Sequence, residues 1–102
     1  MAKTVERTPP RQSVVTGASS GLGLAFAEHL AQAGSDLVLV ARDQSRLEAC
    51  AGDLAATHGV KVRTIPADLS NSVAAGRVFS QLRDWDVTAD VLVNNAGFNV
   101  YG

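Results

Sequence analysis

The sequence predicts an α/β fold in which a parallel sheet lies between layers of helices. Apolar segments of strand length alternate with segments whose apolar residues recur at helical spacing, which is typical of β-α-β units. The segment 37–41 is apolar throughout, as expected for a strand buried on both faces. A glycine-rich turn, 17–23, joins the first strand to the first helix. With right-handed crossovers, these units form a three-layer, doubly wound parallel sheet of strand order 3-2-1-4.

The composition fits one globular domain or part of one. The chain has 102 residues, of which 46% are hydrophobic and 19% charged, and a formal net charge of −1. Because no stripe of Lys and Arg occurs, we expect no nucleic-acid partner. The apolar runs are too short to span a membrane, and the polar start of the chain does not resemble a secretory signal. The single cysteine excludes a disulfide framework, no metal-ligand cluster is evident, and we expect a cytoplasmic protein.

The first β-α unit follows a polar segment. Residues 1–11 include Pro9 and Pro10 and are predicted to form a flexible leader, so that the domain occupies 12–102. A strand is expected at 13–16 and a helix at 21–33, with Gly34 ending the helix. The helix carries small residues at helical spacing, which would let it pack closely on the sheet: Gly23, Ala27 and Ala31.

The second unit begins with the apolar strand at 37–41. Asp43 or Ser45 can cap the helix that follows, because both side chains accept hydrogen bonds from free backbone amides. The apolar positions Leu47, Cys50, Ala51 and Leu54 then follow helical spacing, and the helix is expected to end near His58 and Gly59. A third strand is predicted at 60–66 from its alternating pattern.

The last unit starts at Ser70, the predicted N-cap of the third helix. Its expected apolar stripe consists of Ala75, Val78, Phe79 and Leu82, and Trp85 is expected to anchor the helix. A fourth strand is predicted at 90–94. The strand order would leave this strand without an outer neighbour and one face of the sheet poorly covered, so we expect residues 1–102 alone to be poorly soluble or partly molten.

The glycine turn has the properties of an anion site. The first amides of a helix have no partner within the helix and lie at the positive end of its dipole. A diphosphate can therefore bind there, provided that glycines let the backbone approach it. The spacing G-x-x-x-G-x-G is not the common G-x-G-x-x-G, and a glycine turn by itself is also compatible with a purely structural loop.

Two motifs resemble those of one family. Residues 16–23, TGASSGLG, resemble the T-G-x-x-x-G-x-G motif of the short-chain dehydrogenases/reductases, and residues 94–97, NNAG, resemble the family's N-N-A-G motif. The motifs are 77 positions apart (94 − 17), as in the family. The resemblance covers 14–102, under half of a typical member, and implies a truncated Rossmann fold that binds a dinucleotide.

The resemblance also implies which residues contact the dinucleotide. The turn would bind the pyrophosphate, Asp68 and Leu69 would lie beside the adenine, and the N-N-A-G segment would support the riboses. Asp68 could equally serve only as an acid near a helix start, and it could fill both roles. The complete set of expected cofactor-binding residues is Gly17, Ser19, Ser20, Gly21, Leu22, Gly23, Arg42, Asp68, Leu69, Asn94, Ala96 and Gly97.

The residues after the second strand indicate which dinucleotide binds. An acidic residue at this strand end would favour NAD by binding the ribose hydroxyls. The sequence has Ala41 and Arg42 here, and a guanidinium can hold the 2′-phosphate of NADP. We therefore expect NADP(H). Asp43 is assigned to the helix cap, and NAD would become possible if its side chain turned to the ribose instead.

No residue of the chain receives a catalytic role. The family's catalytic serine, asparagine and Tyr-x-x-x-Lys pair lie beyond the N-N-A-G strand, and Tyr101 lies too close to that motif to correspond to the tyrosine. We expect the NADP(H)-binding portion of an oxidoreductase that interconverts carbonyls and alcohols, inactive alone, with a homo-oligomeric parent. The alternatives are a non-catalytic nucleotide-binding module and one half of a split enzyme that another chain completes.

Overall fold

The computed structural model describes residues 11–19 and 21–94 and contains four strands and three helices in strict alternation within those ranges. The strands are β1 (Gln12–Thr16), β2 (Asp36–Ala41), β3 (Val62–Pro66) and β4 (Val91–Val93). The helices are α1 (Gly21–Gln32), α2 (Gln44–His58) and α3 (Ser72–Asp84). Each element falls within two residues of the position that the sequence predicts.

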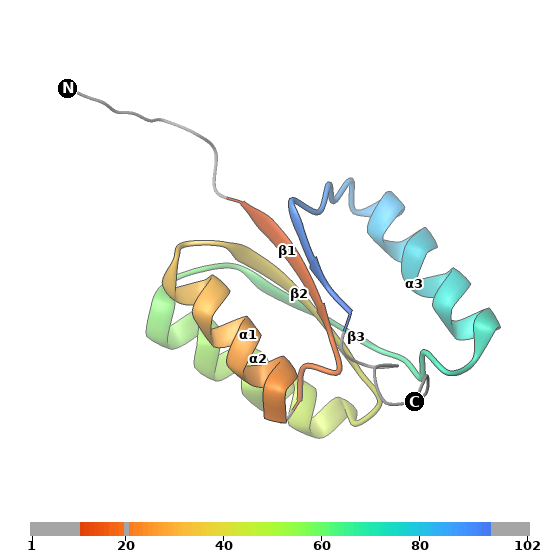
Figure 1. Ribbon diagram of the computed structural model, residues 1–102, viewed down its shortest axis with the longest axis horizontal. Helices are drawn as coiled ribbons and strands as arrows, with labels where there is room; N and C mark the ends of the chain where they lie inside the picture. The colour runs from red at the N-terminus through yellow and green to blue at the C-terminus, as the bar shows by residue number, and fades with distance from the viewer. Residues whose placement is uncertain (1–10, 20, 95–102) are drawn as a thin grey trace.

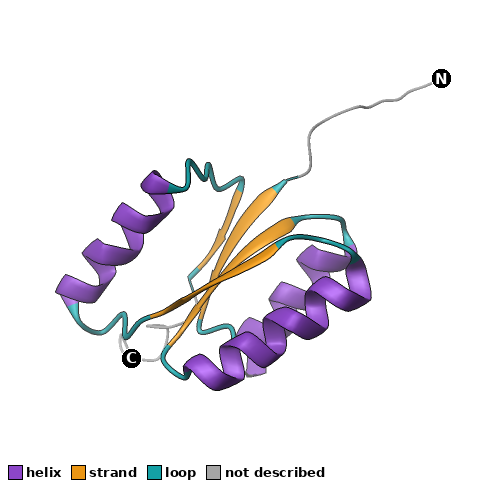
Figure 2. Ribbon diagram, turned by 180° about the vertical axis from the view of Figure 1, so that it is seen from behind, coloured by secondary structure: helices purple, strands orange, loops and turns teal. Residues whose placement is uncertain are grey.

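The strands form one parallel sheet of order β3-β2-β1-β4, which confirms the predicted order. Helices α1 and α2 cover one face and α3 lies over the other, so that the molecule has three layers (Figures 1 and 2). All four strands run in the same direction, and their carboxyl ends therefore meet at one edge of the sheet. We call this edge, which the residues following each strand form, the carboxyl edge.

Strand β2 shows why both faces need apolar residues. Leu37, Leu39 and Ala41 contribute to a core beneath α1 and α2, whereas Val38 and Val40 belong to a second core on the α3 side. Side chains alternate between the faces of a strand, so only a continuous apolar run can supply both cores. The apolar run at 37–41 therefore has the buried position that the sequence predicts.

The predicted ends of α1 and α2 agree with the structure. Gly34 adopts a φ of 94° just after α1, and Gly59 adopts a φ of 69° as the C-cap of α2. Both values lie in the left-handed region, which glycine adopts at little cost. Asp43 rather than Ser45 caps α2, because its Oδ1 accepts a hydrogen bond from the amide of Arg46 at 3.1 Å.

Two predictions for α3 are wrong. The N-cap is Asn71, not Ser70, because Asn71 has the extended backbone of a cap and its Oδ1 accepts from the amides of Val73 and Ala74. Phe79 is not part of the buried stripe and is 64% exposed. The residues of α3 that face the sheet, Ala74, Val78 and Leu82, are spaced four apart, and Phe79 lies one position further round the helix.

The end of α3 is held as the sequence predicts. Trp85 follows the helix, packs against the core on the α3 side, and has the guanidinium of Arg63 from β3 4.9 Å from the centre of its ring. A cation over an aromatic face is attracted by the ring's quadrupole. This contact joins the end of α3 to β3, one of the two edge strands of the sheet.

Candidate cofactor-binding site

The turn between β1 and α1 has two glycines in the left-handed region, with φ values of 64° at Gly17 and 59° at Gly21. Between them, Ala18 is fully buried and its amide donates to the carbonyl of Val40 at 3.3 Å, which ties the turn to β2. A Cβ built on Gly21 would meet no atom within 4 Å, so the space beside the start of α1 is open. The first turn of α1 contains no acidic residue that would repel an anion.

The turn is also held by α2. The half-buried Cys50 has its thiol 3.6 Å from the carbonyl oxygen of Ser19, to which it donates a weak hydrogen bond. Sequence reasoning assigned Cys50 to the core of α2 and missed this contact, because helical spacing identifies a face of a helix but not its partner across 31 residues. The predicted site residue Ser20 lies outside the described residues.

The remaining residues of the turn differ in exposure. Leu22 is 58% exposed at the start of α1, whereas Gly23 is buried on the side of α1 that faces the sheet. An additional side chain at Gly23 would therefore lie between the helix and the strands, and this position serves close packing rather than access from solvent.

The two sequence motifs meet at the carboxyl edge. The hydroxyl of Thr16, the last residue of β1, lies 3.3 Å from the carbonyl oxygen of Val93 and 3.3 Å from Oδ1 of Asn94. The parallel pairing of β1 with β4 brings these residues together although they are 78 positions apart. Sequence reasoning placed Asn94 at this edge but did not identify Thr16 as its partner. The predicted site residues Ala96 and Gly97 lie outside the described residues.

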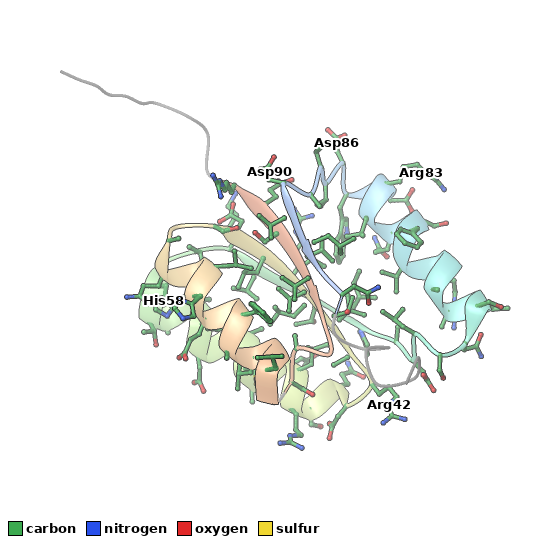
Figure 3. All side chains as sticks on the ribbon, viewed as in Figure 1. Arg42, His58, Arg83, Asp86 and Asp90 are labelled. Atoms are coloured by element: carbon green, nitrogen blue, oxygen red, sulfur yellow. The ribbon has the colours of Figure 1, made fainter. Side chains whose placement is uncertain are left out.

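The end of β2 carries the predicted cation. Arg42 is exposed, and Figure 3 shows it at the carboxyl edge, at the opposite end of the molecule from Asp86 and Asp90. Within the described part of the chain, Arg42 forms no ion pair. Asp43 is occupied as the cap of α2, which is the position that the sequence assigned to it. A guanidinium without a carboxylate partner can bind a phosphate.

The end of β3 supplies an anion beside this cation. The amide of Ala67 donates to the carbonyl of Ala41 at 2.9 Å, so that the segments leaving β2 and β3 start side by side. Asp68 is exposed, and Leu69 packs partly against the core on the α3 side. The hydroxyl and the amide of Ser70 both donate to Asp68, and these bonds hold the pKa of its carboxyl below the ordinary value. The charge of Arg42 lowers this pKa by a smaller amount.

The carboxyl edge therefore combines a glycine turn at a helix start, a guanidinium with no ion-pair partner among the described residues, and the carboxylate of Asp68, whose pKa is lowered. These groups are suited to a ligand that carries phosphates and hydrogen-bond donors. A separate pocket of about 80 Å³ lies at the amino ends of the strands and is lined by Gln12, Asp36, Leu37, Val38, Lys61, Arg63 and Val87. The described residues contain no cluster of side chains suited to a metal ion and no helix that could cross a membrane.

The model of the short chain dehydrogenase family matches residues 11–102. The chain belongs to this family. It is 35% identical over 85 residues to the 3-oxoacyl-(acyl-carrier-protein) reductase of Aquifex aeolicus, and the match covers 83% of the chain and 34% of that reductase. The chain thus spans about a third of the length of this curated relative.

Solved structures of other family members have the same fold. L-sorbose reductase from Gluconobacter frateurii, in complex with NADPH and L-sorbose, matches with a TM-score of 0.82 and 41% identity over 86% of the chain and 34% of that enzyme. A short-chain dehydrogenase from Sphingobium yanoikuyae, in complex with NADPH, matches with a TM-score of 0.74 and 43% identity over 80% of the chain and 32% of that protein. The Rossmann topology that the sequence predicts is confirmed, and both of these relatives were solved with NADPH bound.

Proposed function

We propose that the chain is the NADP(H)-binding portion of a short-chain dehydrogenase that interconverts a carbonyl and an alcohol by hydride transfer. The choice of NADP(H) as cofactor depends on the two residues that follow β2. Arg42 is exposed there without an ion-pair partner among the described residues, and the adjacent Asp43 is occupied as the cap of α2. The complexes of two structural relatives with NADPH support the same choice.

In this proposal the cofactor lies along the carboxyl edge. The turn formed by Gly17, Ser19, Ser20, Gly21 and Leu22 binds the pyrophosphate, while the small Gly23 lets α1 pack close to the sheet. The open space beside Gly21 and the absence of an acidic residue in the first turn of α1 suit a doubly charged ligand.

The remaining residues bind the two ends of the cofactor. Arg42 holds the 2′-phosphate, Asp68 and Leu69 flank the adenine, and Asn94, Ala96 and Gly97 support the riboses. When bound, the nicotinamide accepts or donates the hydride. In this proposal the residues of this chain bind and orient the cofactor, and none of them is assigned a role in proton transfer. A cytoplasmic location and a homo-oligomeric whole enzyme are further predictions from the sequence.

Calorimetric titration with NADPH and NADH tests the choice of cofactor. We expect the chain to bind NADPH more tightly, and Arg42→Ala to weaken NADPH binding about tenfold, because a charge-assisted hydrogen bond contributes about 1.5–3 kcal/mol and Arg42 is exposed. Binding of NADH, which lacks the 2′-phosphate, should change less than twofold.

Arg83→Ala is the matched control, because Arg83 is also exposed but lies in the last turn of α3, at the far end of the molecule (Figure 3). This variant should bind both cofactors like the unmodified chain. Equal weakening of NADPH and NADH by Arg42→Ala would contradict the assignment of Arg42, and no binding of either cofactor would contradict the proposed function.

A further inference from the structure

Strand β4 lies at an edge of the sheet, and its own sequence does not determine its register. It has three residues, Val91, Leu92 and Val93, which pair with β1. A shift by one residue turns every side chain of a strand to the opposite face, and burial opposes this shift only where apolar and polar residues alternate. Because all three residues of β4 are apolar, a shifted strand would present similar side chains to both faces. The register therefore depends on contacts at the ends of the strand.

Three hydrogen bonds hold the amino end of β4. The amide of Asp90 donates to the carbonyl of Gln12 at 2.8 Å, and the amide of Gln12 donates to Oδ2 of Asp90 at 3.2 Å. Oε1 of Gln12 also accepts from the amide of Thr88 at 3.0 Å. We call these three bonds the amino-end clamp. A shift of β4 by one residue would move its atoms by about 3.3 Å along β1 and would break the clamp.

The carboxyl end of β4 is joined to β1 by the hydroxyl of Thr16, which lies 3.3 Å from Oδ1 of Asn94. Asn94 follows Asp90 by four residues, which corresponds to about 13 Å along an extended strand. An extended backbone has little slack, so the position of Asp90 limits where Asn94 can lie. A shift of one residue would both displace the Asn94 side chain and turn it to the other face of the sheet.

We propose that Gln12 and Asp90 are positioning residues for the cofactor: the amino-end clamp sets the register of β4 and thereby places Asn94 beside Thr16 at the carboxyl edge. The role of Asn94 in supporting the riboses rests on the proposed function. Asp90 itself lies at the opposite end of the molecule from Arg42 and does not contact the candidate site (Figure 3). Its effect on the cofactor is therefore transmitted along β4.

The test combines NMR of the chain with dissociation constants for NADPH and NADH. Asp90→Ala removes the acceptor of the Gln12 amide and should shift the backbone amide signal of Thr16 and the side-chain amide signal of Asn94. It should weaken NADPH and NADH by the same factor, about two- to fivefold, which corresponds to weakening one hydrogen bond. Asp90→Asn keeps an acceptor oxygen and should retain both the signals and the affinities.

Two control variants separate this role from a general loss of stability. Asp84→Ala removes another exposed carboxylate, from the last residue of α3. Val60→Ala removes a partly buried side chain that packs against the core beneath α1 and α2, so it should lower stability without acting on β4. Neither control should shift the signals of Thr16 and Asn94 or change the dissociation constants.

The inference is wrong if Asp90→Ala leaves the signals of Thr16 and Asn94 unchanged, or shifts them without weakening either cofactor. It is also wrong if Asp90→Asn behaves like Asp90→Ala, or if Val60→Ala weakens binding to the same extent. If Asp90→Ala does not fold, Gln12→Ala, which removes only the bond from Thr88, decides the same question. If the unmodified chain binds neither cofactor, the proposed function fails, whereas the NMR signals still show whether the clamp positions Asn94.

Discussion

The two faces of the sheet are packed to different degrees. Beneath α1 and α2, the core contains Val15, Leu39 and Leu47, each with no exposed surface. On the α3 side, the cluster of buried residues has only four members among the described residues, Val14, Val38, Val40 and Val78. Leu92 of β4 is 60% exposed and Phe79 of α3 is 64% exposed, so apolar surface remains open to water near this second core.

The difference divides the candidate site between two environments. The turn proposed to bind the pyrophosphate is built on the denser face, since Ala18 belongs to the core beneath α1 and α2 and Cys50 of α2 contacts Ser19. The segment proposed to flank the adenine is attached to the other face through Leu69, which is only partly buried against the smaller core. We infer that the turn after β1 is the more rigid part of the site and that the segment after β3 moves more easily.

The largest expected effect compares the same substitution in one helix from each face. Leu47→Ala, in α2, removes a fully buried side chain and should lower the free energy of unfolding by about 2–5 kcal/mol. Leu82→Ala, in α3, removes a side chain that is only half-buried and should cost about 1 kcal/mol. Urea unfolding measures both values, and equal losses of unfolding free energy would contradict the difference in packing between the two faces.

Replacement of glycine by alanine at two positions extends the comparison, because it should lower stability at one position and raise it at the other. Gly21→Ala places a side chain at a φ of 59° and should destabilise the chain by about 1–2 kcal/mol, although the added Cβ meets no neighbour. Gly76→Ala, in the middle of α3, should stabilise it by about 0.5–1 kcal/mol, since the Cβ again meets no atom within 4 Å and the helix gains propensity.

Thermal unfolding of these two variants and the unmodified chain shows directly whether each substitution lowers or raises stability. If Gly76→Ala were also destabilising, α3 would not be packed or helical as described. If Gly21→Ala were neutral, the turn after β1 would not require its left-handed backbone.

The N-caps test whether each helix opens independently. Asp43→Ala and Asn71→Ala should each remove about 1 kcal/mol, because the amides that their side chains satisfy lose a partner. On the less densely packed α3 side, Asn71→Ala should increase amide hydrogen exchange mainly within α3. Asp43→Ala should affect α2 together with the turn that contacts it. Uniform exchange across the chain in both variants would contradict the difference in local stability.

The smallest effect concerns the titration of Asp68. Its pKa is lowered in the folded chain, so any contribution to stability is present above the pKa of the unfolded chain and is lost as the pH falls through the lower folded value. Ser70→Ala should raise this pKa towards its ordinary value, because the hydroxyl bond is the largest cause of the shift. Side-chain NMR titration checks this, and an unchanged pKa would contradict the role of Ser70.

The sequence predicts the elements and their order well, because short-range patterns determine them. The continuous apolar run at 37–41 and the alternation of helical and strand periods reflect burial. Whether a position is buried determines whether its residue is apolar, so burial leaves a pattern that can be recognised within a short segment. The glycines and Arg42 are also recognisable, since their chemistry requires particular residue types at a turn and at a strand end.

The sequence does not predict which of several neighbouring residues makes a contact. Ser70 and Asn71 are both good N-caps by type, and the choice between them depends on the backbone angle at a single residue. The contact of Cys50 with Ser19 and that of Thr16 with Asn94 depend on how distant elements pack, and no local pattern records this. The predicted apolar stripe of α3 wrongly included Phe79, because helical spacing does not show where the buried face of a helix ends.

The central claim is that the carboxyl edge binds NADP(H), and amide NMR of the chain during titration with NADPH tests it most directly. We predict that the amide signals of Gly17, Ser19, Gly21 and Arg42 shift with saturation, while those of Lys61 and Val87, beside the pocket at the amino ends of the strands, do not. Signals that shift only around that pocket, or that do not shift at saturating NADPH, would contradict the claim.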